Sequence, residues 1–381
     1  MAAAYAGYLS KCCHVFRRST LPKCNILPSI FARVTRGQRN AAVTSHSQLG
    51  TTIEGACSLT RKSGGSARLA TLMAALSLFG SSESKEEELI LLLKKAKLSI
   101  AKGELEAASS FLHAAAVIAQ QERHRAAIIY TYSQMANLAY VQGQLLEAEK
   151  LFKAAMSYML ADGMPQDDNA FVEMSLKLAA MYAQQNKPEL AEHGFRFCLE
   201  TLEAKVQKLQ ETPAHQLTEE EEILRKDTRL LLGLCLDSRA RYLASTRRLS
   251  GAADDYSKAL EISAQEQGPH HHQTLVLMSD LSTILDMQGR HDDALALIRQ
   301  AVDAGRASGH QDLHILLANM AAILLHAGCR DDGMRLFHEA LSLAQAAKDE
   351  EAVRHILQGL ERTTENTETR PEQEGAEPRV T

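Results

Sequence analysis

From residue 86 onward, apolar and polar positions follow a helical period, and short breaks at Gly, Asn or Pro separate the runs. Apolar residues that recur three and four positions apart lie on one face of a helix. The pattern therefore predicts an almost entirely helical body over residues 86–361, made of short helices joined by tight turns. A last helix is expected near 350–361.

Six segments of this body repeat one arrangement of small and large residues. They are GELEAASSFLHAAA (103–116), GQLLEAEKLFKAAM (143–156), NKPELAEHGFRFCL (186–199), RRLSGAADDYSKAL (247–260), GRHDDALALIRQAV (289–302) and GCRDDGMRLFHEAL (328–341). Each carries a small residue, a large apolar residue four positions later, and a second small residue three positions after that. A further small residue stands twelve positions before the first, so four columns run through all six segments.

The columns have a physical explanation. Two helices approach to about 8–10 Å only where small side chains stand at the crossing. The large residue one turn along fills the groove that the crossing leaves. Because no single helix pair buries its apolar surface alone, the pairs must stack on one another. The sequence therefore predicts six helical hairpins in one all-α array.

This small–large–small pattern resembles the tetratricopeptide repeat family. The resemblance implies a right-handed superhelical solenoid of about six helix pairs. Successive repeats are 40, 43, 61, 42 and 39 residues apart, whereas the ordinary repeat has about 34, so these repeats are long ones of about 42. The segment EQGPHHHQT (266–274) is similar to the Gly-x-x-His-Pro-x-Thr turn of long repeats of the kinesin-light-chain type, with His272 in place of the proline.

The longest spacing indicates an insertion near 204–228, centred on QETPAHQLTEEEEILRK (210–226). We expect a lengthened helix, a break at Pro213 and an acid-rich restart. Residues 362–381 are polar and rich in Pro and Glu, with too little apolar content to fold, and are expected to be a disordered tail.

The N-terminal region differs from the repeat body in charge. Residues 1–68 contain ten basic side chains and one acid, so their +9 leaves −5 − 9 = −14 for residues 69–381. Such a basic, Ser-rich segment is typical of a mitochondrial presequence and is expected to be disordered. A disordered basic tail without an address and a nucleic-acid-binding arm are the alternatives. The acidic body argues against a general nucleic-acid binder.

Residues 69–82 form a short apolar segment between this leader and the repeats. As a helix, an uncharged stretch of this length reaches about 21 Å, which is short of the roughly 30 Å hydrocarbon core of a bilayer. We interpret it as a sorting or anchor segment rather than a full membrane span.

The sequence contains no catalytic constellation above background, so we expect a protein that is not an enzyme and has no cofactor or metal. The run His270–His272 is better explained as a solvated turn than as a metal site. Three Asp pairs (254–255, 292–293 and 331–332) are expected at the starts of second helices, where acids complement the helix dipole. Cys198, Cys235 and Cys329 are expected to be small core residues.

A stack of helix pairs presents its first helices along a concave groove. By analogy with peptide-binding members of the family, the residue after the upstream small column contacts the backbone of a ligand. In the second hairpin this residue is Asn137, and the alternative is that it bridges or caps neighbouring helices. The predicted partner-binding residues are Tyr130, Ser133, Asn137, Tyr140 and Asn319.

Several segments resemble one mitochondrial family of long tetratricopeptide repeats more closely. They are ELILLLKKAKLSI (88–100), YSQMANLAYVQGQLLEAEKLFKAAMSYML (132–160), EMSLKLAAMYAQQN (173–186) and HQTLVLMSDLSTILDMQGRHDDA (272–294). The resemblance implies a protein of the inner membrane that supports respiratory complex III and aids clearance of fragments of its Rieske iron–sulfur subunit. The basic leader and the apolar segment together predict that the repeats face the intermembrane space, and full import into the matrix is the competing outcome. The alternatives are a cytosolic kinesin-light-chain-like cargo adaptor and a co-chaperone clamp.

Overall fold

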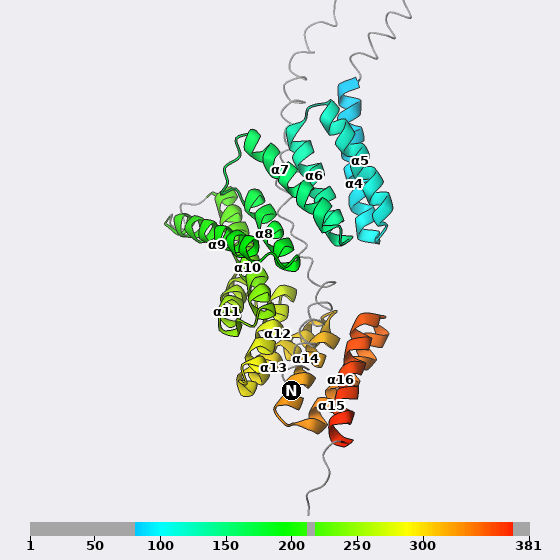
Figure 1. The fold of residues 1–381 in the computed structure, drawn as a ribbon, viewed down its shortest axis with the longest axis vertical. Helices are drawn as coiled ribbons and strands as arrows, with labels where there is room; N and C mark the ends of the chain where they lie inside the picture. The colour runs from blue at the N-terminus through cyan, green and yellow to red at the C-terminus, as the bar shows by residue number, and fades with distance from the viewer. Residues whose placement is uncertain (1–80, 212–217, 369–381) are drawn as a thin grey trace, which may run out of the picture. The chain divides into compact units, whose positions relative to one another are not determined.

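The computed structural model describes residues 81–211 and 218–368, which contain thirteen helices and no strand. The predicted all-α fold is therefore confirmed (Figure 1). The predicted presequence, residues 69–80 of the apolar segment, and Pro213 lie outside the described residues. The described chain divides into two compact units, one ending at Gly194 and the other beginning at Phe195. Each unit is described by itself.

The N-terminal unit contains the first two hairpins. It also contains the first helix of the third hairpin and the start of that hairpin's second helix. Its helices are α4 (Ser81–Lys102), α5 (Leu105–Gln121), α6 (Arg125–Val141), α7 (Leu145–Ala161), α8 (Asn169–Gln184) and the start of α9 (Pro188–Gln210). Helix α4 packs against α5 and α6 against α7, and the hairpins join through the contacts of α5 with α6 and of α7 with α8 (Figure 1).

The C-terminal unit continues the same arrangement after the rest of α9. Its helices are α10 (Glu219–Ser245), α11 (Leu249–Glu266), α12 (His272–Met287), α13 (His291–Ser308), α14 (Leu313–His326), α15 (Arg330–Ala346) and α16 (Glu350–Glu368). The pairs α10–α11, α12–α13 and α14–α15 form hairpins, and α16 closes the unit against α15 and α14. The first helices α12 and α14 are also in contact.

Each predicted column lies in the core of the structure. In the second hairpin, for example, Ala148 is 0% exposed and Phe152 is 1% exposed. The upstream small column is Ala96, Ala136, Ala179, Ala240, Ser282 and Ala321. The column at the start of the second helices is Ala108, Ala148, Ala191, Ala252, Ala294 and Gly333. All of these residues are buried, so the six-repeat alignment is confirmed.

The large column and the last small column are buried as well. The large residues are Leu112, Phe152, Phe195, Tyr256, Ile298 and Phe337. The small residues three positions later are Ala115, Ala155, Cys198, Ala259, Ala301 and Ala340. Close approach at the crossings leaves little room: a Cβ added to Gly194 would lie 2.7 Å from the Cβ of Ala179.

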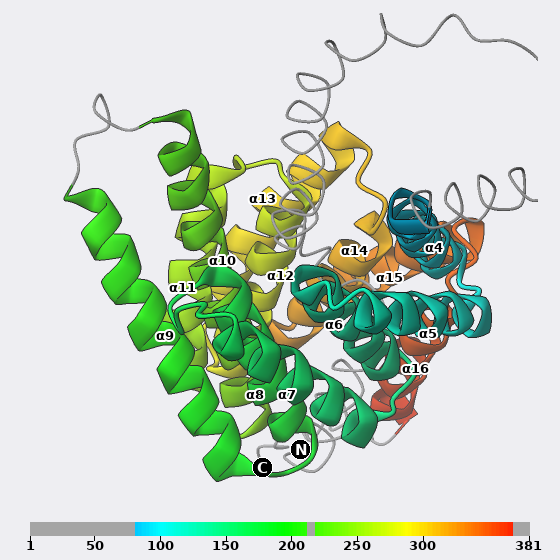
Figure 2. The same ribbon diagram turned by 90° about the horizontal axis from the view of Figure 1, so that it is seen from above.

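The lengthened helix predicted before the break is α9, and α10, which follows the break, is long as well. Helix α9 has 23 residues and α10 has 27, and Figure 2 shows both in green. The acid-rich restart begins with a capping box, in which the Glu221 backbone N–H donates to Thr218 Oγ1 and the Thr218 backbone N–H donates to Glu221 Oε2. Such a reciprocal pair satisfies two backbone donors at a helix start.

Two boundary or packing expectations need correction. Helix α16 continues to Glu368, so the expected disordered tail does not begin at 362; the first residue incompatible with a helix interior is Pro371, and a helix usually ends before such a residue. Cys198 and Cys235 are buried as predicted, but Cys329 is exposed. It stands at the N-cap of α15, where the chain is still exposed, and the first buried residue of that helix is Gly333.

The explanation by the helix dipole holds for two of the three Asp pairs. Asp292–Asp293 and Asp331–Asp332 occupy the first turns of α13 and α15. Asp255 is instead buried within α11 and accepts two hydrogen bonds of 2.6 Å from Arg239 of α10. Asp255 and Arg239 therefore form an ion pair between α11 and α10. Because α11 begins at Leu249, its first turn ends before Asp254, and the dipole explanation does not apply to this Asp pair.

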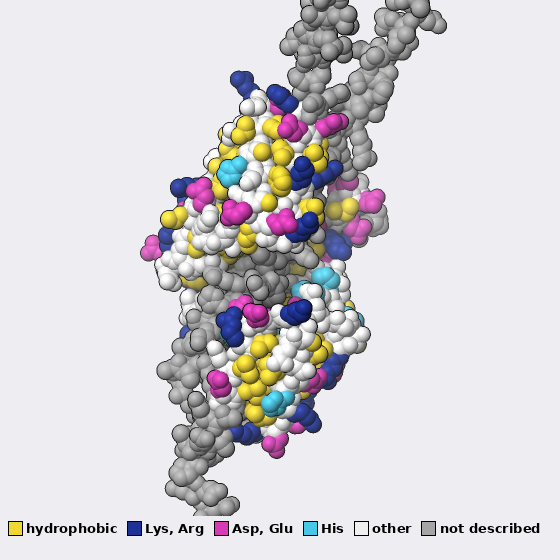
Figure 3. All heavy atoms as spheres, turned by 90° about the vertical axis from the view of Figure 1, so that its right-hand side faces the viewer, with side chains coloured by type: hydrophobic (Ala, Val, Ile, Leu, Met, Phe, Trp, Pro, Cys, Tyr) yellow, Lys and Arg dark blue, Asp and Glu magenta, His cyan; other side chains and the backbone are white. Residues whose placement is uncertain are grey.

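Large apolar side chains are exposed on several helices, the terminal helices α4 and α16 among them, and Figure 3 shows apolar side chains at the surface. Leu91 and Leu98 of α4 are 50% and 56% exposed, and Leu357 of α16 is 41% exposed. Terminal helices of a repeat array lack a neighbour on one side. Among the described residues, no helix combines enough length and apolar content to cross a bilayer.

Candidate functional site

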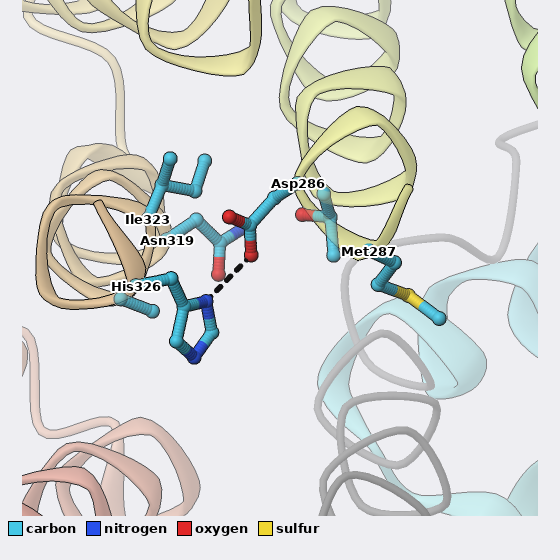
Figure 4. A pocket seen from close by; sticks show the side chains of 7 residues that line it. Asp286, Met287, Asn319, Ile323 and His326 are labelled. Carbon is cyan, nitrogen blue, oxygen red and sulfur yellow. Dashed lines mark hydrogen bonds and ion pairs between the residues drawn. The ribbon is translucent and has the colours of Figure 1, made fainter. Parts of the chain in front are cut away.

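A shallow pocket lies between the first helices α12 and α14 of the C-terminal unit (Figure 4). Thr283 and Ala322 each directly follow a residue of the upstream small column, which is the position expected to contact a ligand backbone. Asn319, predicted from the sequence, also lines the pocket. The lining residues are Thr283, Asp286, Met287, Asn319, Ala322, Ile323 and His326.

Asn319 joins the two helices through its side-chain amide. Its Nδ2 donates to Ser279 Oγ of α12 over 2.8 Å. Asn319 remains partly exposed, whereas Ser279 is buried. A side-chain amide also has a carbonyl oxygen that can accept a hydrogen bond. Asn319 can therefore hold α12 against α14 and accept from a backbone N–H of a peptide.

Asp286 organises the polar end of the pocket. Its carboxylate is 5% exposed and accepts from His326 Nδ1 over 2.6 Å and from His291 Nδ1 over 2.7 Å. Figure 4 shows the bond from His326, which comes from α14, to Asp286, which comes from α12. Because a carboxylate only accepts, both rings carry a proton on Nδ1. Asp286 thereby joins α12, α13 and α14 at one point.

A second polar group lies between α10 and α12. Arg241 Nη2 is 2.8 Å from Asp237 Oδ2 and 3.7 Å from Asp280 Oδ2, and both carboxylates are buried. Burial raises the pKa of Asp280 to about 7, against the opposing attraction of Arg241. Burial likewise raises the pKa of Asp237. One guanidinium therefore lies between two buried carboxylates, one from α10 and one from α12.

The N-terminal unit holds the other predicted residues. Asn137 Oδ1 of α6 accepts from Lys177 Nζ of α8 over 3.0 Å, and Lys177 Nζ is 2.8 Å from the buried Glu173. Tyr140 Oη accepts from Gln184 Nε2 over 2.6 Å. Asn137 therefore bridges neighbouring first helices, which was the alternative interpretation. A role for Asn137 and Tyr140 in partner binding stays a prediction.

Tyr130 and Ser133 of the predicted site lie in the core, and a role for them in partner binding stays a prediction. They are 1% and 0% exposed, and Ser133 Oγ donates to the carbonyl oxygen of Tyr130 over 2.7 Å. Helix α6 packs against α5 and α7, so most of its faces are covered. Helical spacing from the sequence placed both residues on the face of Asn137, but it could not show how narrow the uncovered part of that face is.

Sequence reasoning also missed residues that line the pocket. Thr283 occupies the position after the small column, so the same rule that selected Asn137 could have found it. Asp286 and His326 gave no signal, and neither did His291, which contacts Asp286 outside the pocket, because these contacts join residues on three helices.

The chain is similar to known proteins over much of its length. The tetratricopeptide repeat family model matches residues 230–307, from α10 to α13. "Tetratricopeptide repeat protein 19, mitochondrial" of Danio rerio is 61% identical over 61% of this chain, a match that spans 59% of that protein. The protein of the same name from Rattus norvegicus is 47% identical, covering 77% of this chain and 82% of its own.

Solved structures agree with the fold at low sequence identity. The apo form of RapI has a TM-score of 0.55 at 14% identity, covering 79% of this chain and 78% of its own. A Pyrococcus horikoshii signal-transduction ATPase with a tetratricopeptide repeat sensor has a TM-score of 0.51 at 14% identity, covering 77% of this chain and 37% of its own. These likenesses concern the helical repeat fold alone.

The six buried repeat columns, the family match within α10–α13 and the 47% identity over most of the length of the rat protein lead to one conclusion. The chain belongs to the mitochondrial tetratricopeptide repeat protein 19 family.

Proposed function

We propose that this protein is a non-enzymatic, protein-binding scaffold of mitochondria that acts at the inner membrane. It binds respiratory complex III, supports the assembly or maintenance of that complex, and aids clearance of processed fragments of the Rieske subunit. The observation that carries the mitochondrial part is the identity of 46–61% to four vertebrate relatives whose names include the word mitochondrial.

The pocket between α12 and α14 supports binding as the mode of action. Repeat arrays of this kind present first-helix side chains to extended partners. Thr283 and Asn319 offer hydrogen-bonding groups that suit a peptide backbone, and Met287 and Ile323 offer apolar contact. Main-chain hydrogen bonds combined with side-chain pockets are a recurrent way to hold an extended peptide. A proteolytic fragment with an unfolded end has this form.

The proposal is tested by affinity purification from mitochondria that lack their own copy of the protein. The tagged chain is expected to recover complex III subunits and Rieske fragments, quantified by mass spectrometry. The double variant Thr283→Val, Asn319→Ala should recover at least tenfold less. Lys258→Ala is the matched control, because Lys258 is exposed on the second helix α11 and should leave recovery unchanged.

Two results would contradict the proposal. Recovery of kinesin or cytosolic chaperones without any complex III subunit would favour the cargo-adaptor or co-chaperone alternative. Equal recovery by the double variant and the control would exclude the α12–α14 pocket, and Asn137→Ala then tests the first-helix position in the N-terminal unit.

A further inference from the structure

The start of α12 and the turn before α14 bring three potential metal ligands together. They are His272, the first residue of α12, and His310 and Asp312, which precede α14. One ligand atom from each lies within 4.8 Å of the others. The run of three histidines was expected to be a solvated turn, but that interpretation considered His272 without His310, which is 38 residues away.

The two imidazole rings face each other closely. His272 Nδ1 is 2.7 Å from His310 Nε2, and the two ring planes are nearly parallel, with centroids 4.7 Å apart and an interplanar angle of 14°. Asp312 Oδ2 lies 3.9 Å from His272 Nδ1. This oxygen is buried and accepts no hydrogen bond within the described residues. A buried acceptor without a hydrogen bond is costly, and a cation would remove that cost.

The hydrogen bond between the two rings also suits a metal. A histidine ligates a metal only as the neutral imidazole. Only one proton can lie between the two facing nitrogens, and a metal ion replaces it.

We propose that His272 Nδ1, His310 Nε2 and Asp312 Oδ2 bind one divalent transition-metal ion, and that zinc fits the set best. Zinc takes His nitrogen and carboxylate oxygen at about 2.0–2.2 Å in a tetrahedron, which separates its ligand atoms by roughly 3.3–3.5 Å. To reach that geometry the two nitrogens, now 2.7 Å apart, need to open by roughly 0.6 Å, and Asp312 Oδ2, now 3.9 Å from His272 Nδ1, needs to approach that nitrogen by about 0.5 Å. A water molecule completes the fourth position.

Binding has one local cost and one structural consequence. The Asp312 backbone N–H donates to His310 Nδ1 over 3.1 Å, and this bond is lost when a metal on Nε2 moves the ring proton to Nδ1. In return, the ion ties the start of α12 to the turn before α14. The site therefore fastens the fifth hairpin to the sixth.

The test is a zinc titration of the full-length protein after treatment with a chelator, followed by calorimetry and by the visible absorption of cobalt as a probe. At zinc concentrations that just saturate the wild type, we expect His310→Ala and Asp312→Asn to bind one ion fewer. The reason is that these variants should lose at least tenfold in affinity at this site. His270→Ala is the matched control, since His270 belongs to the same run but is exposed. It should bind as the wild type does.

Thermal unfolding distinguishes a variant that has lost the metal site from a variant that does not fold. Circular dichroism without metal establishes that each variant is folded, and His272→Ala replaces any variant that is not. Saturating zinc should raise the midpoint of the wild type and of His270→Ala, and leave the midpoints of the site variants unchanged. Equal stoichiometry and affinity in the wild type and His310→Ala, or no zinc binding by the wild type, would overturn the proposal.

Discussion

At the residue scale, the most unusual feature of the C-terminal unit is charge in its interior. Asp280 is 6% exposed and lies 3.7 Å from Arg241, which already makes a 2.8 Å contact with Asp237. Removing a carboxylate from water favours its neutral form. One guanidinium is shared between two carboxylates, and Asp280 is the more distant of the two. The attraction of Arg241 therefore does not offset the burial of Asp280, whose pKa is raised to about 7.

This shift makes the stability of the protein depend on pH through Asp280. Its pKa is about 7 in the folded chain and about 3.9 in the unfolded chain. Between these values the folded state binds more protons, so the free energy of unfolding falls as the pH rises from about 4 to about 7. The contribution of this group is at most about 1.4 kcal/mol per pH unit.

Asp280→Asn should remove that contribution. Urea unfolding at several pH values from 5 to 8 should show a variant that gains stability relative to the wild type as the pH rises. His271 and His310, whose pKa values burial lowers, titrate in both proteins, so the difference between the two isolates Asp280. Parallel curves for the two proteins would show that Asp280 has an ordinary pKa.

At the element scale, hairpins are held by apolar columns and, in the fourth hairpin, also by ion pairs between α10 and α11. Asp255 of α11 receives a bidentate contact from Arg239 of α10, with both hydrogen bonds at 2.6 Å. Bidentate Arg–carboxylate pairs are among the strongest charge-assisted contacts. The carboxylate side chain is 3% exposed and the guanidinium side chain 34%, so water screens only one partner.

Asp255→Ala should destabilise the protein by roughly 2–4 kcal/mol, somewhat below the cost of breaking a fully buried pair, because Arg239 keeps contact with water. The neighbouring exposed Asp254 provides the control, and Asp254→Ala should change stability by no more than about 0.5 kcal/mol. Chemical denaturation measures both. If the two substitutions cost the same, the ion pair does not hold α10 to α11.

At the scale of the whole molecule, the proposed location predicts which side of the inner membrane the repeats face. A basic leader directs the N-terminus towards the matrix, and the apolar segment at 69–82 is expected to slow or stop passage there. The acidic repeat body would then remain in the intermembrane space, where it can reach complex III.

Protease added to mitochondria with ruptured outer membranes should therefore digest the repeats, while a soluble matrix protein in the same sample stays intact. Sequencing of the mature N-terminus by mass spectrometry shows in parallel whether residues 69–82 remain attached. Repeats that stay protected until the inner membrane is opened would place them in the matrix and rule out the sorting-segment interpretation.

The amino-acid sequence by itself determined the repeat number, the helix pairs, the core columns and the lengthened helix before the insertion. These features depend on residue size at fixed spacing along the chain, and spacing is visible without a structure. Ala148, Phe152 and Ala155 could be assigned to a crossing because the same three positions recur in every repeat.

Only the tertiary structure decided which polar residues meet. Asp255 with Arg239, Asp286 with His326, and His272 with His310 each join different helices or turns. The positions of such partners follow from how the hairpins and their helices pack on one another. The helical period of the sequence does not predict that packing. Tyr130 and Ser133 illustrate the same limit, since spacing located their face of α6 but neighbouring helices determined that this part of the face is buried.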